Sequence, residues 1–180
     1  KVCYNLPIDI FFNRIPFLNP LTHENYIKMA DYIAETTNQI LPNEKVDVVA
    51  YGCTSGTIEI GEERIKYEIH KSKSDALITT PITAAIKAFK LSNFKKIAVL
   101  TPYPKEVNIK VYDYLIKNEL DIKSFNSFNL NYDSEIAKVT QDSLIQTISS
   151  IDLSDIDCLF VSCTALKILD LIEDLEENLK

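Results

Sequence analysis

Apolar and β-branched residues in this chain gather in five short runs, and a longer amphipathic stretch separates each run from the next. The runs cover residues 46–51, 76–79, 97–100, 122–128 and 159–162. They show little alternation, which is typical of strands covered on both faces. Stretches with helical periodicity cover residues 25–41, 57–70, 82–89, 105–118, 134–150 and 165–179. This order predicts an α/β fold with mainly parallel sheets.

The length of 180 residues suits one domain, or two small lobes packed as one unit. The stretch Leu91-Ser92-Asn93-Phe94 divides the chain nearly in half. We therefore expect an N-terminal α/β lobe over residues 1–92 and a C-terminal α/β lobe over residues 93–180. Because the sequence opens on Lys1-Val2-Cys3, which is not an initiator sequence, we also expect the first lobe to lack its first strand.

Composition narrows the classes of function. The net charge of -7 and the two histidines argue against a broad surface for nucleic acid. No run of eighteen or more apolar residues occurs, so we expect no membrane-spanning helix. Four cysteines in 180 residues do not suggest a disulfide scaffold, and they predict a cytoplasmic protein with reduced thiols.

One local pattern occurs twice and places a cysteine where a predicted strand ends. Asp47 precedes a largely apolar run that leads to Cys53-Thr54, and Asp157 stands in the same relation to Cys163-Thr164. In both copies we expect a helix to follow. Ligands of open α/β sheets bind beyond the carboxyl ends of the strands, so the repeat predicts two thiols that face one cleft.

Two such thiols have a definite chemical use. A helix N-terminus stabilises a thiolate and lowers the pKa of the cysteine, and we expect this effect at Cys53 and Cys163. The thiolate then serves as a base or nucleophile, while the opposite thiol donates a proton. This pair suits proton transfer at a carbon next to a carboxylate, with no metal or organic cofactor. Cys3 and Cys158 are interpreted as small core residues.

Other site chemistries lack their residues. A zinc site needs more ligands than the isolated His23 and His70 provide, and no C-x-x-C motif occurs. A cysteine phosphatase loop needs an arginine shortly after the thiol, and neither Cys53 nor Cys163 has one. The nucleophile elbow of serine hydrolases, the P-loop and the dinucleotide-binding glycine motif are absent.

Four motifs carry a resemblance to a known family, and they extend over most of the chain. The motifs are Tyr51-Gly-Cys53-Thr-Ser-Gly-Thr57, Thr80-Pro-Ile-Thr-Ala-Ala85, Leu100-Thr-Pro-Tyr103 with Glu106-Val-Asn108, and Val161-Ser-Cys163-Thr-Ala-Leu166. With them the chain resembles the aspartate/glutamate racemase superfamily. Within it, the chain is similar to the branch of maleate cis-trans isomerases, arylmalonate decarboxylases and EutA-like proteins.

The resemblance implies a fold, a reaction and roles for single residues. It implies two Rossmann-like lobes related by pseudo-twofold symmetry, with the active site between them and a possible homo-oligomeric assembly. Cys53 would be the nucleophile and Cys163 the acid/base, acting on a small carboxylic acid as an isomerase or racemase. The residues that would bind the carboxylate are Thr54, Ser55, Tyr103 and Thr164.

Some assignments have a second interpretation. Tyr103 lies between two prolines and is also a typical turn residue, and Thr54 and Thr164 could cap helices. The family's first strand and its asparagine loop, which precede residues 13–15, and its C-terminal Ser-Asn-Gln-Ala segment have no counterpart in this sequence. A second family asparagine is replaced near residues 132–134. A decarboxylase or EutA-like enzyme and a non-catalytic binder of small acids therefore stay open, although decarboxylases of this branch typically keep only the second cysteine.

Overall fold

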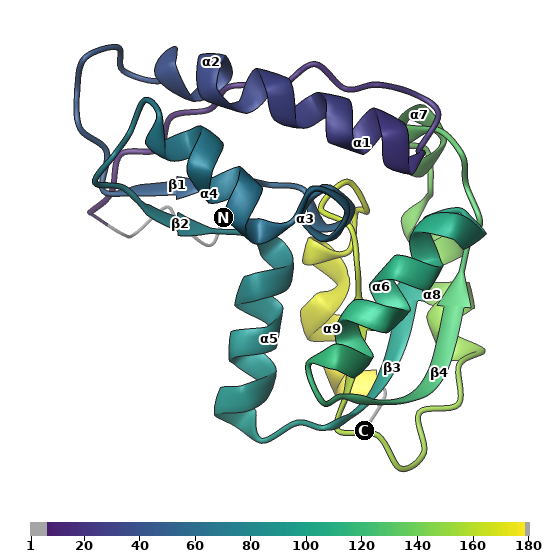
Figure 1. Cartoon of the computed structure of the whole chain (residues 1–180). Helices are drawn as coiled ribbons and strands as arrows, with labels where there is room; N and C mark the ends of the chain where they lie inside the picture. The colour runs from purple at the N-terminus through teal and green to yellow at the C-terminus, as the bar shows by residue number, and fades with distance from the viewer. Residues whose placement is uncertain (1–6, 179–180) are drawn as a thin grey trace.

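The computed structural model, which describes residues 7–178, contains two parallel sheets (Figure 1). In the smaller sheet β1 pairs with β2, and in the larger sheet β3 lies between β4 and β5. The strands are β1 Val48–Ala50, β2 Leu77–Thr79, β3 Lys96–Thr101, β4 Asp121–Ser127 and β5 Cys158–Val161. Each predicted run therefore overlaps one strand, and the predicted α/β fold with parallel sheets is confirmed.

The helices follow the predicted stretches but are more broken (Figure 1). They are α1 His23–Met29, α2 Ile33–Asn38, α3 Thr54–Ile60, α4 Glu62–His70, α5 Pro81–Ser92, α6 Lys105–Lys117, α7 Asp133–Ile136, α8 Gln141–Ser149 and α9 Ile172–Asn178, with 3-10 turns at Ala30–Tyr32 and Leu169–Leu171. The predicted helix over residues 57–70 is split at Gly61, whose φ of 90° is foreign to a right-handed helix.

Helix α5 leads from the smaller sheet to the larger one (Figure 1). It begins with a capping box between Thr80 and Thr83 and has Pro81 in its first turn. It ends at Asn93, which adopts the left-handed conformation with φ 56°. The stretch expected to separate the lobes is thus the end of a helix, and the division into residues 1–92 and 93–180 stays a prediction.

Two groups of buried residues form the core. The larger group surrounds β3, whose residues Ile97, Ala98, Val99 and Leu100 have no exposed surface. The smaller group lies around β1 and contains Ala30, Ile33, Tyr51, Ile65 and Ile69. Cys53 packs against both groups, so the fold holds its side chain where the two cores meet.

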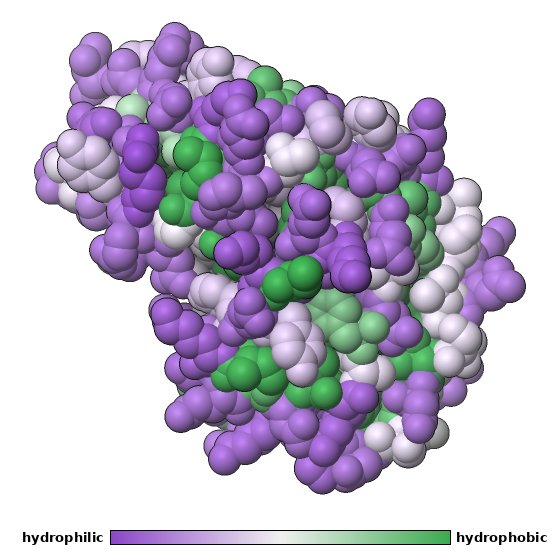
Figure 2. Space-filling view, turned by 45° about the vertical axis from the view of Figure 1, so that its right-hand side comes forward, coloured by the Kyte–Doolittle hydropathy of each residue, from purple (hydrophilic) through white to green (hydrophobic). Residues whose placement is uncertain are grey.

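The surface is mostly polar. Figure 2 shows one face on which apolar residues form several small groups among hydrophilic ones. Within residues 7–178, no helix has both the length and the apolar character that crossing a membrane requires.

Candidate active site

Cys53 follows the last pairing of the smaller sheet and caps the next helix. The backbone N–H of Tyr51 donates to the carbonyl of Thr79, which extends the β1–β2 pairing up to this point. Cys53 is the N-cap of α3, and its Sγ accepts a hydrogen bond from the Gly56 N–H at 3.3 Å. The predicted position of Cys53 between a strand and a helix is therefore confirmed.

Cys163 also follows a strand, but no helix begins there. The Ser162 N–H donates to the Leu100 carbonyl at 2.9 Å, after which Cys163 has φ 97°. This φ cannot continue into a right-handed helix, and the next residues form a turn before the 3-10 turn Leu169–Leu171. The prediction of a helix starting directly after Thr164 is thus wrong. Because non-glycine residues rarely adopt positive φ, Cys163 is held in its conformation by its surroundings.

The two cysteine segments meet although they lie far apart in the sequence. The Thr164 hydroxyl donates to the Gly52 carbonyl at 2.8 Å, a contact across 112 residues. The charge of Cys53 also raises the pKa of Cys163, as expected for two groups in one site. Thr164 therefore joins the two strand ends instead of capping a helix.

Burial raises the pKa of both thiols, since it disfavours the charged thiolate. At Cys53 the Gly56 amide and the Ser55 hydroxyl act in the opposite direction, and a nearby Asp133 adds to the increase. At Cys163 the pKa is lowered in part by the amides of Ala165 and Leu166 and by the Tyr103 hydroxyl. The expectation that helix N-termini lower both pKa values is wrong, because the loss of water around the sulfurs outweighs the backbone donors.

Tyr103 belongs to this site. Its side chain is 1% exposed, and its hydroxyl lies 3.2 Å from the Ser162 Oγ, next to Cys163. Its carbonyl accepts hydrogen bonds from the Asn108 amide at 2.7 Å and from the Ser127 hydroxyl at 2.8 Å. Burial raises the pKa of Tyr103, with further increases from both cysteines. The turn between two prolines thus presents the phenol to the thiols.

Thr54 and Ser55, the other predicted binding residues, are buried in the first turn of α3. The Ser55 hydroxyl donates to the Tyr26 hydroxyl at 2.9 Å and lies 3.8 Å from the Cys53 Sγ. It is therefore held by α1, with its oxygen close to the sulfur.

Two further tyrosines surround the thiols and were missed from the sequence. Tyr26, on α1, is 2% exposed, and burial raises its pKa, as do the charges of Cys53 and Cys163. Tyr51 is 6% exposed, and its pKa is also raised, first by burial and then by the charge of Cys53. The position of Tyr51 inside the first cysteine motif could have identified it as a site residue. Tyr26 belongs to no motif, so nothing in the sequence indicated such a role for it.

A cavity of about 240 Å³ reaches Cys53 from the side of the smaller sheet. Cys53, Tyr51 and Gly52 form one wall of this cavity. Apolar side chains from the segment before α1 and from the helices form most of the rest, together with Asn13 and Arg14. Arg14 points its guanidinium to within 4.0 Å of Asp133.

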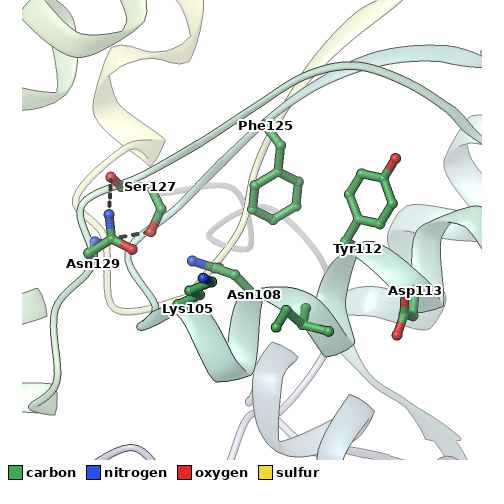
Figure 3. A pocket seen from close by; sticks show the side chains of 8 residues that line it. Lys105, Asn108, Tyr112, Asp113, Phe125, Ser127 and Asn129 are labelled. Atoms are coloured by element: carbon green, nitrogen blue, oxygen red, sulfur yellow. Dashed lines mark hydrogen bonds between the residues drawn. The ribbon is translucent and has the colours of Figure 1, made fainter.

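A larger cavity, of about 390 Å³, lies between α6 and β4 and contains neither thiol (Figure 3). Its lining residues are Lys105, Asn108, Ile109, Tyr112, Asp113, Phe125, Ser127 and Asn129. Asn108 and Ser127 are the two residues that hold the Tyr103 carbonyl. The cavity thus lies behind the candidate site and is not part of it.

Comparison with known families decides the relationship. The family model described as arylmalonate decarboxylase matches residues 11–180. The chain belongs to this family. Curated relatives include the maleate isomerase of Nocardia farcinica, 22% identical over 140 residues, which cover 73% of this chain and 56% of the relative. The maleate isomerase of Alcaligenes faecalis is 18% identical over 174 residues, which cover 92% of this chain and 67% of the relative.

Solved structures of the same branch share the fold of this member of the arylmalonate decarboxylase family. The maleate isomerase Iso of Pseudomonas putida S16 aligns with a TM-score of 0.79 at 21% identity, over 89% of this chain and 67% of that one. An arylmalonate decarboxylase structure aligns with a TM-score of 0.68 at 21% identity, and the alignment covers 88% of this chain and 70% of that one. The chain spans little more than half of the length of the Nocardia relative.

Proposed function

We propose that this chain carries the active site of a cofactor-independent isomerase or racemase of a small carboxylic acid, of the maleate isomerase type. The observation that supports this most is the meeting of the two cysteine segments, joined by the hydrogen bond from Thr164 to Gly52. The relatives add support. A variant of the Nocardia farcinica maleate cis-trans isomerase carries a covalently bound succinylcysteine intermediate, and it aligns with a TM-score of 0.78 at 18% identity.

For a cis-alkene diacid, Cys53 first bonds to the substrate and is later released, while Cys163 first donates a proton and later takes it back. The Cys53 thiolate adds to one alkene carbon, and the Cys163 thiol gives its proton to the other. The former double bond is now single and rotates. The Cys163 thiolate then takes the proton back, and the C–S bond breaks to return its electron pair to Cys53. In a racemisation, one thiolate removes the proton next to the carboxylate and the opposite thiol supplies another.

The surrounding hydroxyls would hold the carboxylates. Tyr103 and Thr164 lie on the Cys163 side, and Thr54 and Ser55 belong to the Cys53 side. Hydrogen bonds to a carboxylate are about twice as strong as those between neutral groups, so an acid would compete for hydroxyls that now bond to protein. The proposal also includes a reducing, cytosolic environment, because both thiols must stay free. We also propose that the chain assembles as a homo-oligomer.

Incubation of the full chain with maleate, aspartate or glutamate in deuterated buffer tests the activity. We expect proton NMR to show fumarate, or deuterium at the carbon next to the carboxylate. Cys53→Ala and Cys163→Ala should each lower turnover at least about a hundredfold, the usual scale of a lost acid/base group. Cys158→Ala, on β5, is the matched control and should keep its activity. Retained turnover in either active-site variant would remove that cysteine from the mechanism.

The match to the arylmalonate decarboxylase family supports a second candidate, loss of CO₂ from a substituted malonate. A measurement of CO₂ released from phenylmalonate distinguishes the two reactions, because only a decarboxylase releases it. A decarboxylase would depend on Cys163 and tolerate Cys53→Ala, whereas the proposed isomerase needs both thiols. If a panel of small acids is bound and none reacts, the chain is a non-catalytic binder.

A further inference from the structure

The Tyr51 hydroxyl is a buried polar group with unused hydrogen-bonding capacity. The ring of Tyr51 packs in the smaller core group with Ile33, Ile65 and Ile69. Its Oη is shielded from solvent and makes no hydrogen bond within residues 7–178. Buried hydroxyls nearly always have a partner, because leaving one unpaired costs free energy. A buried hydroxyl that stays unpaired therefore needs an explanation from the groups around it.

The geometry around Gly56 places the Tyr51 hydroxyl near the Cys53 sulfur. A Cβ placed on Gly56 would lie 2.7 Å from the Tyr51 Oη and 2.9 Å from the Cys53 Sγ. The hydroxyl and the sulfur therefore converge on the same point above the first turn of α3. Only a residue without a side chain leaves both atoms this space.

The Cys53 sulfur has few donors for a buried group. It accepts from the Gly56 N–H at 3.3 Å, and the Ser55 Oγ lies at the longer distance of 3.8 Å. A thiolate in this place needs further donors to replace water. The other titratable groups whose charge couples to Cys53 are Tyr26, Tyr51, Tyr103, Cys163 and Asp133.

We propose that Tyr51 is a positioning residue for Cys53 and that its hydroxyl donates a hydrogen bond to the Cys53 Sγ when this thiol has lost its proton. The phenol keeps its own proton, since burial raises its pKa above the ordinary value. The bond is charge-assisted and belongs to the thiolate state, which explains why the hydroxyl is unpaired beside a neutral thiol. This inference rests on the proposed role of Cys53 as nucleophile, but its test needs no substrate.

Tyr51→Phe removes only the hydroxyl, and iodoacetamide reports the thiolate of Cys53 directly. The rate of alkylation at Cys53, followed by peptide mass spectrometry in the full chain at pH 8, should fall about tenfold, as expected for a lost hydrogen bond to a charged group. The midpoint of urea unfolding should stay the same or rise, because the variant no longer buries an unpaired hydroxyl. A purely structural tyrosine would not give slower alkylation together with undiminished stability.

Ser124→Ala is the matched control, since the Ser124 Oγ is another buried hydroxyl without a hydrogen bond in the described chain and lies on β4. It should leave the alkylation of Cys53 unchanged. Wild-type rates in Tyr51→Phe, or an equal decrease in Ser124→Ala, would overturn the inference. Faster alkylation of both Cys53 and Cys158 would indicate an opened fold and would also overturn it. If no small acid reacts but Tyr51→Phe slows alkylation, the proposed function fails and the positioning role stands.

Discussion

Cys53 and Cys163 sit in surroundings that oppose their own ionisation. Burial raises the pKa of each thiol, and the backbone amides near each sulfur offset only part of this effect. A site of this kind keeps its thiols protonated until a ligand or a nearby donor favours the thiolate. Such a site suits a reaction in which one thiol must give a proton at the moment when the other acts as nucleophile.

At the residue scale, Gly56 is the glycine with the least space for a side chain. Gly56→Ala places a methyl group 2.7 Å from the Tyr51 Oη and 2.9 Å from the Cys53 Sγ. Alanine is favoured over glycine in a helix by about 1 kcal/mol, but forcing atoms into a packed interior costs about 1–3 kcal/mol. We expect a net loss in the free energy of unfolding, measured by urea denaturation. Adding Tyr51→Phe should recover part of this loss, and no recovery would mean that the sulfur alone carries the clash.

At the element scale, the break between α3 and α4 sets the length of the helix that carries Cys53. Gly61 has φ 90°, and a Cβ there would meet no atom within 4 Å. Gly61→Ala should therefore destabilise the fold by about 1–2 kcal/mol through backbone strain alone. Gly52→Ala is the matched control, because Gly52 also has open space but no positive φ, and its urea midpoint should stay near the wild-type value. Equal effects of the two substitutions would contradict this explanation.

The strands and the first cysteine were predictable because their signals are local. Continuous apolar runs indicate parallel strands, and β1, β3 and β5 lie where those runs are. The expectation that these strands are covered on both faces holds for β3, whereas β1 is largely exposed. The turn after Cys163 was not predictable, since nothing in the sequence marks its positive φ. Tyr26 was equally hidden: it reads as one more residue of an amphipathic helix, and only the packing of α1 on α3 brings its hydroxyl to Ser55.

At the scale of the whole molecule, the buried thiols link stability to pH. A thiol whose pKa is higher in the folded than in the unfolded chain stabilises the fold below the ordinary pKa of a cysteine, about 8.5, and this contribution is lost as the pH rises through the folded-state value. Burial raises the pKa of both Cys53 and Cys163. It also raises the pKa of Cys158, to about 11. We expect the free energy of unfolding from urea titrations to decrease between pH 8 and pH 10.

Serine variants distinguish the contribution of the two thiols to this pH dependence from that of other groups that ionise at high pH. Cys53→Ser and Cys163→Ser should each make the decrease shallower, because a serine hydroxyl does not ionise in this range. The buried tyrosines have raised pKa values too and act in the same direction at higher pH. A free energy of unfolding that stays constant from pH 8 to pH 10 would contradict the assigned burial of the thiols.

The hydrogen bond from Thr164 to Gly52 has a consequence for the order in which the protein gains its chemistry. The bond spans 112 residues, and contacts of such long sequence separation form late, after the local structure around them. During synthesis, Cys53 emerges long before Cys163 and remains an ordinary cysteine until the second half of the chain is complete. The two-thiol arrangement therefore exists only in the folded chain, whereas an unfolded or nascent chain presents Cys53 as an exposed thiol with the ordinary pKa of a cysteine.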